Sequence, residues 1–122
     1  MPIVDVTLVT GRQEEIVVGL TQTLADGIGR ALASPPAQTW VRLHVLAQDR
    51  YAENEAIVSA GDLPVFVVVL ARAVPDRVRL AVDVTSVSAA VAEATGRPAA
   101  RVHVEFAPPA AGRIAFGGRI VE

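Results

Sequence analysis

The sequence predicts a two-layer α/β sandwich (α+β in content), in which a four-stranded sheet carries two helices on one face. A strand–helix–strand pattern occurs twice along the 122 residues, and the two copies align at an offset of about sixty positions. Apolar residues make up 52% of the chain, which is enough for one sizeable core at this length. We therefore predict a single domain, 1–122, with a first unit over 2–47, a linker over 48–62 and a second unit over 63–122.

The first unit begins with a strand over residues 3–9, because apolar side chains there recur at every second position. From Glu14 the apolar residues recur at steps of three and four, which predicts a helix. Glu14 and Glu15 would lie in its first turn, where carboxylates suit the helix dipole. Pro35 and Pro36 would end the helix, since proline cannot continue its hydrogen-bond ladder.

A second strand over residues 40–47 completes the first unit. Its side chains alternate, with Val41, Leu43 and Val45 on one face and Arg42 among those on the other. The two strands that flank a crossover helix should be parallel, and the crossover should be right-handed.

The pattern restarts after the polar, turn-rich linker. Residues 65–70 form a continuous apolar run, as expected of a strand covered on both faces. Pro75 suits the first turn of a second helix, and Gly96 is a stop signal for it. Residues 102–106 alternate as a fourth strand, and residues 115–120 predict a short closing hairpin.

The duplication leaves one face of the predicted sheet uncovered. Helices cover the first face, whereas the second is rich in Val and Thr. A sheet face of that size must be buried elsewhere, and association of subunits is the simplest way.

Composition disfavours several classes of function. A net charge of −2 and only 4% aromatic residues disfavour a nucleic-acid surface, which needs clustered positive charge or stacking platforms. No apolar run reaches the length of a membrane span, and the first residues lack a signal-peptide pattern. The absence of Cys is typical of a cytoplasmic protein. His44 and His103 have no Cys or carboxylate at ligand spacing, so we expect no metal site and no cofactor.

Pro2 is the most distinctive candidate for chemistry. The chain has no Cys, and all eleven of its basic residues are Arg, so no thiol and no side-chain amine can act as nucleophile or base. Removal of Met1 would leave Pro2 as a free secondary amine at the end of a predicted strand. With Met1 attached, the Pro2 nitrogen is an amide and has no basicity.

The order of these features resembles the tautomerase superfamily. The matching features are an N-terminal Pro, a strand, Gly11-Arg12, an amphipathic helix and a strand reading Val-Arg-Leu. Within that superfamily the chain most resembles the 4-oxalocrotonate tautomerase type. Its unit is duplicated, as in longer members such as the chloroacrylic acid dehalogenases and macrophage migration inhibitory factor. Residues 113–118 resemble the Gly-Gly hairpin that closes the short members. The resemblance covers nearly the whole chain except 48–62, and it implies a homotrimer with three sheets wrapped into a barrel.

The resemblance implies that Pro2 is a general base, or a general acid as in hydratase-like relatives. Burial in an apolar pocket near arginines lowers the pKa of such an amine toward neutrality. The amine could then remove a proton next to a carbonyl and return it at another carbon. The implied activity is that of a cofactor-independent tautomerase or isomerase acting on an enol or unsaturated keto acid.

Arginines are the expected substrate-binding residues, because a guanidinium binds a carboxylate bidentately and stabilises a developing oxyanion. In the short members, the arginine after Gly serves the proline of a partner unit, and here the two halves replace that pair. By this resemblance Arg72 should approach Pro2, while Arg12 should face a second site that has no amine. Arg42 and His103 take the corresponding positions on the second strand of each unit.

The hairpin supplies the remaining expected site residues. Ile114 and Phe116 would form an apolar wall that keeps the amine neutral. Dehalogenase-like members use a hairpin carboxylate where Ala115 stands, and a helix histidine near Gly29, so dehalogenation and hydration are disfavoured against isomerisation. Tyr51 and other polar linker residues are predicted to be loop residues, with capping of the pocket as the alternative.

Two further hypotheses stay open. The chain could be a non-catalytic pocket protein on the same fold, or one whose activity does not use its proline. It could also be a relative that decarboxylates, hydrates or cyclises a pathway intermediate.

Overall fold

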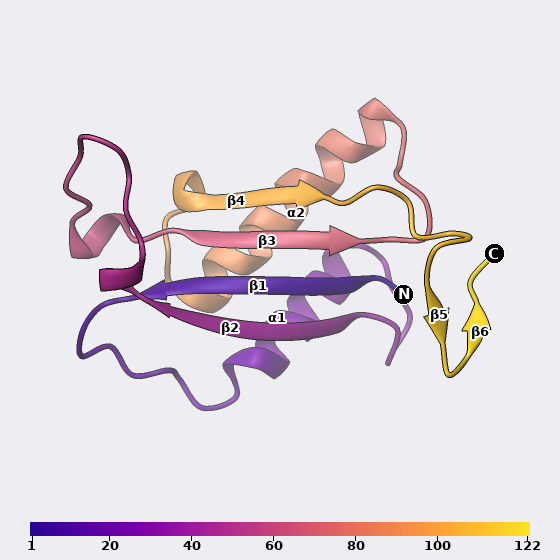
Figure 1. The fold of residues 1–122 in the computed structure, drawn as a ribbon, viewed down its shortest axis with the longest axis horizontal. Coiled ribbons are helices and arrows are strands. Elements are labelled where there is room, and N and C mark those ends of the chain that lie inside the picture. The colour runs from indigo at the N-terminus through magenta and orange to yellow at the C-terminus, as the bar shows by residue number, and fades with distance from the viewer.

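A four-stranded mixed sheet forms one layer of the molecule, and two helices form the other (Figure 1). The computed structural model describes residues 1–122. The strands are β1 (Ile3–Thr10), β2 (Trp40–Ala47), β3 (Val65–Leu70) and β4 (Val102–Phe106), in the order β2-β1-β3-β4. β1 pairs with β2 and β3 with β4 in parallel, while the central β1–β3 pair is antiparallel. The predicted four-stranded sheet with two βαβ units is confirmed.

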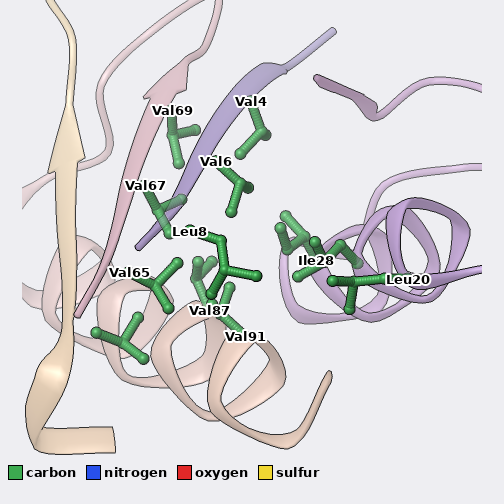
Figure 2. Close-up of a cluster of buried hydrophobic side chains, with 12 residues drawn as sticks. Val4, Val6, Leu8, Leu20, Ile28, Val65, Val67, Val69, Val87 and Val91 are labelled. Carbon is green, nitrogen blue, oxygen red and sulfur yellow. The ribbon is translucent and has the colours of Figure 1, made fainter. Parts of the chain in front are cut away.

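Both helices, α1 (Leu20–Ala31) and α2 (Arg77–Thr95), pack on the same face of the sheet. Alternate residues of β1 and β3 point toward them and form the core between the layers, because side chains in a strand alternate between the two faces. Figure 2 shows these side chains meeting those of the helices. The core cluster consists of Val4, Val6, Leu8, Leu20, Leu24, Ile28, Val65, Val67, Val69, Val87, Val91 and Val102.

The first helix begins later than its apolar period predicts. α1 starts at Leu20, so the prediction that Glu14 and Glu15 lie in its first turn is wrong. Gly19 precedes the helix in the left-handed region at φ 83°, a conformation that no helical residue adopts. Glu14 instead accepts a hydrogen bond from the backbone N–H of Gly11 at 3.0 Å, which holds residues 11–14 in a turn.

The observed helix, strands and hairpin of the second unit begin and end close to the predicted residues. α2 begins at Arg77 rather than at Pro75, because the Asp76 carboxylate caps it by accepting the Arg79 N–H at 2.9 Å. Gly96 ends α2 in the left-handed conformation at φ 72°, as predicted. The hairpin is also confirmed, as β5 (Ala115–Phe116) and β6 (Arg119–Ile120) joined by two positive-φ glycines. Three short 3₁₀ turns cover Gln48–Arg50, Ala60–Asp62 and Ala99–Arg101.

The second face of the sheet is uncovered in the single chain. The prediction that β3 is covered on both faces is wrong for one copy of the protein, since no layer lies beyond Phe66, Val68 and Leu70. Phe66 is 37% exposed. Val45 pairs with Leu8, so its side chain points toward the helices as that of Leu8 does. It is nevertheless half-exposed, because it lies toward the end of β2, a strand at the edge of the sheet.

An ion pair ties the turn after β1 to the end of α2. Arg97 donates to the Glu14 carboxylate at 2.8 Å and to the carbonyl of Val9 at 2.7 Å. The Arg97 hydrogen bond lowers the pKa of Glu14 below its usual range. The contact therefore stabilises the fold above the unfolded-state pKa of Glu14, and that stabilisation is lost as the pH falls through the lowered folded-state value.

Replacing Glu14 with Gln should lower the free energy of unfolding by about 1 kcal/mol at pH 7, because a charge-assisted hydrogen bond is lost. The difference from wild type should narrow as the pH falls from 7 toward 2, measured by urea unfolding at each pH. Glu15→Gln is the matched control, since Glu15 is exposed and should change stability little at any pH. If the free energy of unfolding of Glu14→Gln stayed below that of wild type by the same amount at every pH, the ion-pair account would be contradicted.

Candidate active site

Pro2 lies buried directly before β1, at the edge of the sheet where β2 also begins. Its carbonyl accepts the backbone N–H of Trp40 at 3.0 Å, which continues the parallel ladder in which Ile3 faces Trp40. β3 runs the other way, so its last residue, Leu70, pairs with Ile3. The start of β1, the start of β2 and the end of β3 therefore meet at one edge, which we call the Pro2 edge.

The two predicted arginines after the first strand of each unit lie at opposite edges of the sheet. Arg72 follows Leu70 by two residues, which brings it to the Pro2 edge, and its Nε donates to the backbone oxygen of Glu122. Arg12 follows the far end of β1, which is eight residues or about 26 Å long. It lines a shallow cleft there with Ala47, Gln48 and Asp49.

The closing hairpin also comes to the Pro2 edge. Backbone N–H groups of Ala110 and Ala111 donate to the carbonyls of Ala71 and Arg72, at 3.0 and 3.1 Å, so the chain before the hairpin is tied to the chain after β3. Figure 1 shows β5 and β6 beside the N-terminus, beyond the first residues of β1 and β2. Ile114 and Phe116 are half-buried there.

Trp40 is a site residue that the sequence reasoning missed. Its ring centroid lies 4.8 Å from that of Phe116, with the planes tilted by 57°, a geometry that aromatic pairs prefer. Its Nε1 donates to the carbonyl of Ala37 at 3.0 Å. A signal was present in the sequence, because parallel strands of one unit begin at the same edge and Trp40 is the first residue of its strand.

Arg42 lies on the uncovered face of the sheet and is bound by a carboxylate of the same chain. Asp5 stands opposite it in register, and its two oxygens accept from Nε at 2.7 Å and from a terminal nitrogen at 2.8 Å. These bonds hold the pKa of Asp5 below its usual range. His44 Nε2 lies 3.3 Å from the same carboxylate. Two donors of the Arg42 fork are therefore already occupied in the single chain.

His103 lies toward the opposite edge, near the beginning of β4. It faces Phe66 in register, with ring centroids 5.3 Å apart. Tyr51 also packs on Phe66, with ring centroids 5.8 Å apart, and donates to Glu53 at 2.6 Å. Tyr51 and Glu53 thus lie away from Pro2. Pro64 directly precedes β3 as Pro2 precedes β1, but its nitrogen is inside the chain.

Solved structures with this arrangement are numerous. Pt0534 inactivated by 2-oxo-3-pentynoate matches with a TM-score of 0.72 and 20% identity over 97% of this chain and 95% of that chain. A wild-type fused 4-OT that forms an asymmetric trimer matches with a TM-score of 0.74 and 15% identity, over 97% and 94%. FG41 malonate semialdehyde decarboxylase, inhibited by 3-bromopropiolate, matches with a TM-score of 0.69 and 16% identity, over 94% and 88%.

The chain has the tautomerase-superfamily fold. No protein-family model matches the sequence, and no curated protein sequence matches it. At these identities the likeness establishes the fold, and the reaction has to be argued from the residues of the site.

The duplicated tautomerase fold gives the chain two related edges with different chemistry. The Pro2 edge holds Pro2, Arg72 and the Trp40–Phe116 ring pair, whereas the opposite edge holds Arg12 and an internal proline, Pro64. No three His, Asp or Glu side chains gather into a group that could hold a metal ion. Neither helix is long and apolar enough to cross a bilayer.

Proposed function

We propose that this protein is a cofactor-independent tautomerase or isomerase that moves a proton on an enol or unsaturated keto acid. The observation that carries the proposal is the meeting of a buried Pro2 with Arg72 and an apolar aromatic wall at one edge of the tautomerase fold. Pt0534, which has the same fold, is inactivated by 2-oxo-3-pentynoate, and that compound is itself an unsaturated keto acid.

Removal of Met1 makes Pro2 the base. In the proposed ketonisation, the amine nitrogen takes the proton of the enol hydroxyl, and the oxygen–carbon bond becomes the carbonyl. The electron pair of the former carbon–carbon double bond takes a proton back from the proline ammonium at a neighbouring carbon. The amine is thereby regenerated, so no cofactor or second substrate is needed.

Arg72 is the proposed substrate-binding residue. Its guanidinium would bind the substrate carboxylate and stabilise the negative charge that develops on the enolate oxygen. Nε already donates to the Glu122 oxygen, which leaves the two terminal nitrogens for this task. Arg42 is a second candidate only in an assembly that loosens its bond to Asp5, since that carboxylate now neutralises it.

We infer that the functional form is a homotrimer. The uncovered sheet face carries Phe66, which is 37% exposed, together with the Asp5–Arg42 pair. The fused 4-OT of the same fold forms a trimer. Light scattering on the purified protein should give three chain masses, and a monomer at micromolar concentration would contradict the inference.

The test of the activity begins with the N-terminus. Intact mass shows whether Met1 is absent, and protein that begins at Pro2 should accelerate the ketonisation of 2-hydroxymuconate or phenylenolpyruvate, followed by absorbance. Protein that retains Met1 should be inactive, because its Pro2 nitrogen is an amide. If protein that begins at Pro2 accelerates neither reaction, the proposed activity is wrong and a binding role on the same fold becomes the better account.

Decarboxylation of an oxo acid is the second candidate function. FG41 malonate semialdehyde decarboxylase has the same fold at a TM-score of 0.69. A guanidinium such as that of Arg72 could stabilise the enolate that forms as carbon dioxide leaves. Release of carbon dioxide from malonate semialdehyde, without ketonisation of either enol, would favour this function.

A further inference from the structure

The indole of Trp40 is held in one place at the Pro2 edge. Its backbone N–H is bonded to Pro2, its Nε1 is bonded to Ala37, and its ring packs on Phe116. These three contacts come from three different segments of the chain, and they fix both the position and the tilt of the ring. A side chain positioned in this way can select among ligands, because it loses little freedom when a ligand binds.

Much of this fixed ring is uncovered. Trp40 is 45% exposed, which is unusual for so large an apolar side chain. Its one polar atom is already satisfied by the Ala37 carbonyl, so the exposed part offers ring surface and no free donor. That surface suits a flat apolar group better than a polar one.

We propose that Trp40 determines the specificity of the Pro2 site, by packing its ring against a flat conjugated or aromatic group of the substrate while Arg72 binds the carboxylate. The inference rests on the proposed function, since it assigns the part of the substrate that accompanies the carboxylate in the same site. It adds a residue and a preference that neither Pro2 nor Arg72 can supply, because an amine and a guanidinium act on the reacting end of the molecule.

The expected preference comes from the contact between two aromatic rings, which contributes binding energy beyond the burial of the same apolar area. A saturated ring of equal size buries a similar apolar area, but it lacks the charge distribution that favours offset and tilted packing of aromatic rings. Such packing corresponds to a preference of up to about tenfold in binding constant for the flat ligand.

The test compares two ligands that differ only in the ring. Phenylpyruvate and 3-cyclohexyl-2-oxopropanoate carry the same oxo acid, and their dissociation constants can be measured by calorimetry on the intact protein. Wild type should bind phenylpyruvate several-fold more tightly, with about tenfold as the upper limit. Trp40→Leu should bring the two constants within about twofold, and Trp40→Phe should restore most of the preference.

Control variants separate recognition from folding and assembly. Arg72→Ala should weaken both ligands equally and keep their ratio. Phe116→Leu keeps the indole at position 40 but removes the ring that helps to fix its tilt, so it should reduce the ratio. Circular dichroism with light scattering should show each variant folded and in the wild-type association state. This second variant keeps the proposal testable if Trp40→Leu does not fold.

Three results would overturn the inference. One is equal binding of the two ligands to wild type, another is an unchanged ratio in Trp40→Leu, and the third is a loss of association in Trp40→Leu with both ligands weakened alike. A clear preference for phenylpyruvate in a protein that begins at Pro2 but ketonises neither enol would support the recognition role and overturn only the proposed function.

Discussion

Replacing Pro2 with alanine is expected to lower kcat for ketonisation by about 10²-fold, the lower end of the usual contribution of a positioned general base, because an amine remains but is no longer held in place. The variant still begins with an amine once Met1 is removed, so the comparison isolates the secondary amine and its ring. A primary amine rotates freely about its bond to Cα, whereas the proline ring fixes the nitrogen against the edge of the sheet. The measurement is the steady-state rate with each enol, after intact mass has confirmed the N-terminus of both proteins.

Pro64→Ala is the matched control for this prediction. Pro64 is the counterpart of Pro2 in the second unit, buried directly before β3, but its nitrogen lies within the chain. Its replacement should leave kcat near the wild-type value, with any loss of packing visible as a lower Tm. Equal rates for Pro2→Ala and wild type would rule out catalysis by the proline amine.

Replacing Arg72 with alanine is expected to lower kcat/KM by about 10²–10³-fold, the size of effect seen when one stabilising donor is removed from a developing oxyanion. Both functions proposed for this guanidinium would be lost, namely binding of the carboxylate and stabilisation of the enolate oxygen. Arg72→Lys should recover only part of the loss, because an ammonium cannot bind a carboxylate through a planar fork. The measurement is kcat and KM separately, since loss of binding raises KM and loss of oxyanion stabilisation lowers kcat.

Arg12→Ala is the control that the fold provides. Arg12 is the residue that aligns with Arg72 in the other unit, and it lies at the far end of β1 from Pro2. Its replacement should change kcat/KM less than about twofold if the Pro2 edge alone is active. A large loss in Arg12→Ala combined with normal activity in Arg72→Ala would reverse the assignment of the two edges.

Hydrophobic period predicted the strands and the second helix because each buries one regular face. β1 and β4 alternate at period two, and the layered core of Figure 2 follows directly from that alternation. The same reasoning placed the start of the first helix at Glu14, six residues too early. Val17 continues the apolar period, yet it is exposed, and Gly19 takes a left-handed conformation that period alone does not reveal.

The candidate site was predictable only in part. The register of β1 against β3 brings Arg72 to the Pro2 edge, in agreement with the alignment of the two units, although the roles of the two residues stay a proposal. Trp40 reaches Phe116 across seventy-six positions of sequence, and the Asp5–Arg42 bond crosses from β1 to β2. Contacts of this kind depend on which strands are neighbours and in what register, and hydrophobic period specifies neither.

The sequence by itself determined the two βαβ units, the single terminal proline and the absence of any other amine or thiol. The units follow from the spacing of apolar residues along the chain, and the available amine follows from residue identity. Neither property depends on which segments become neighbours in the fold. Tertiary structure alone decided which arginine is neutralised by a carboxylate, and that the Trp40 ring packs on Phe116. The physical reason is strand pairing. The register of β1 against β2 sets Asp5 opposite Arg42, and the antiparallel pairing of β1 with β3 brings the end of β3, to which the chain before the hairpin is bonded, beside the start of β1.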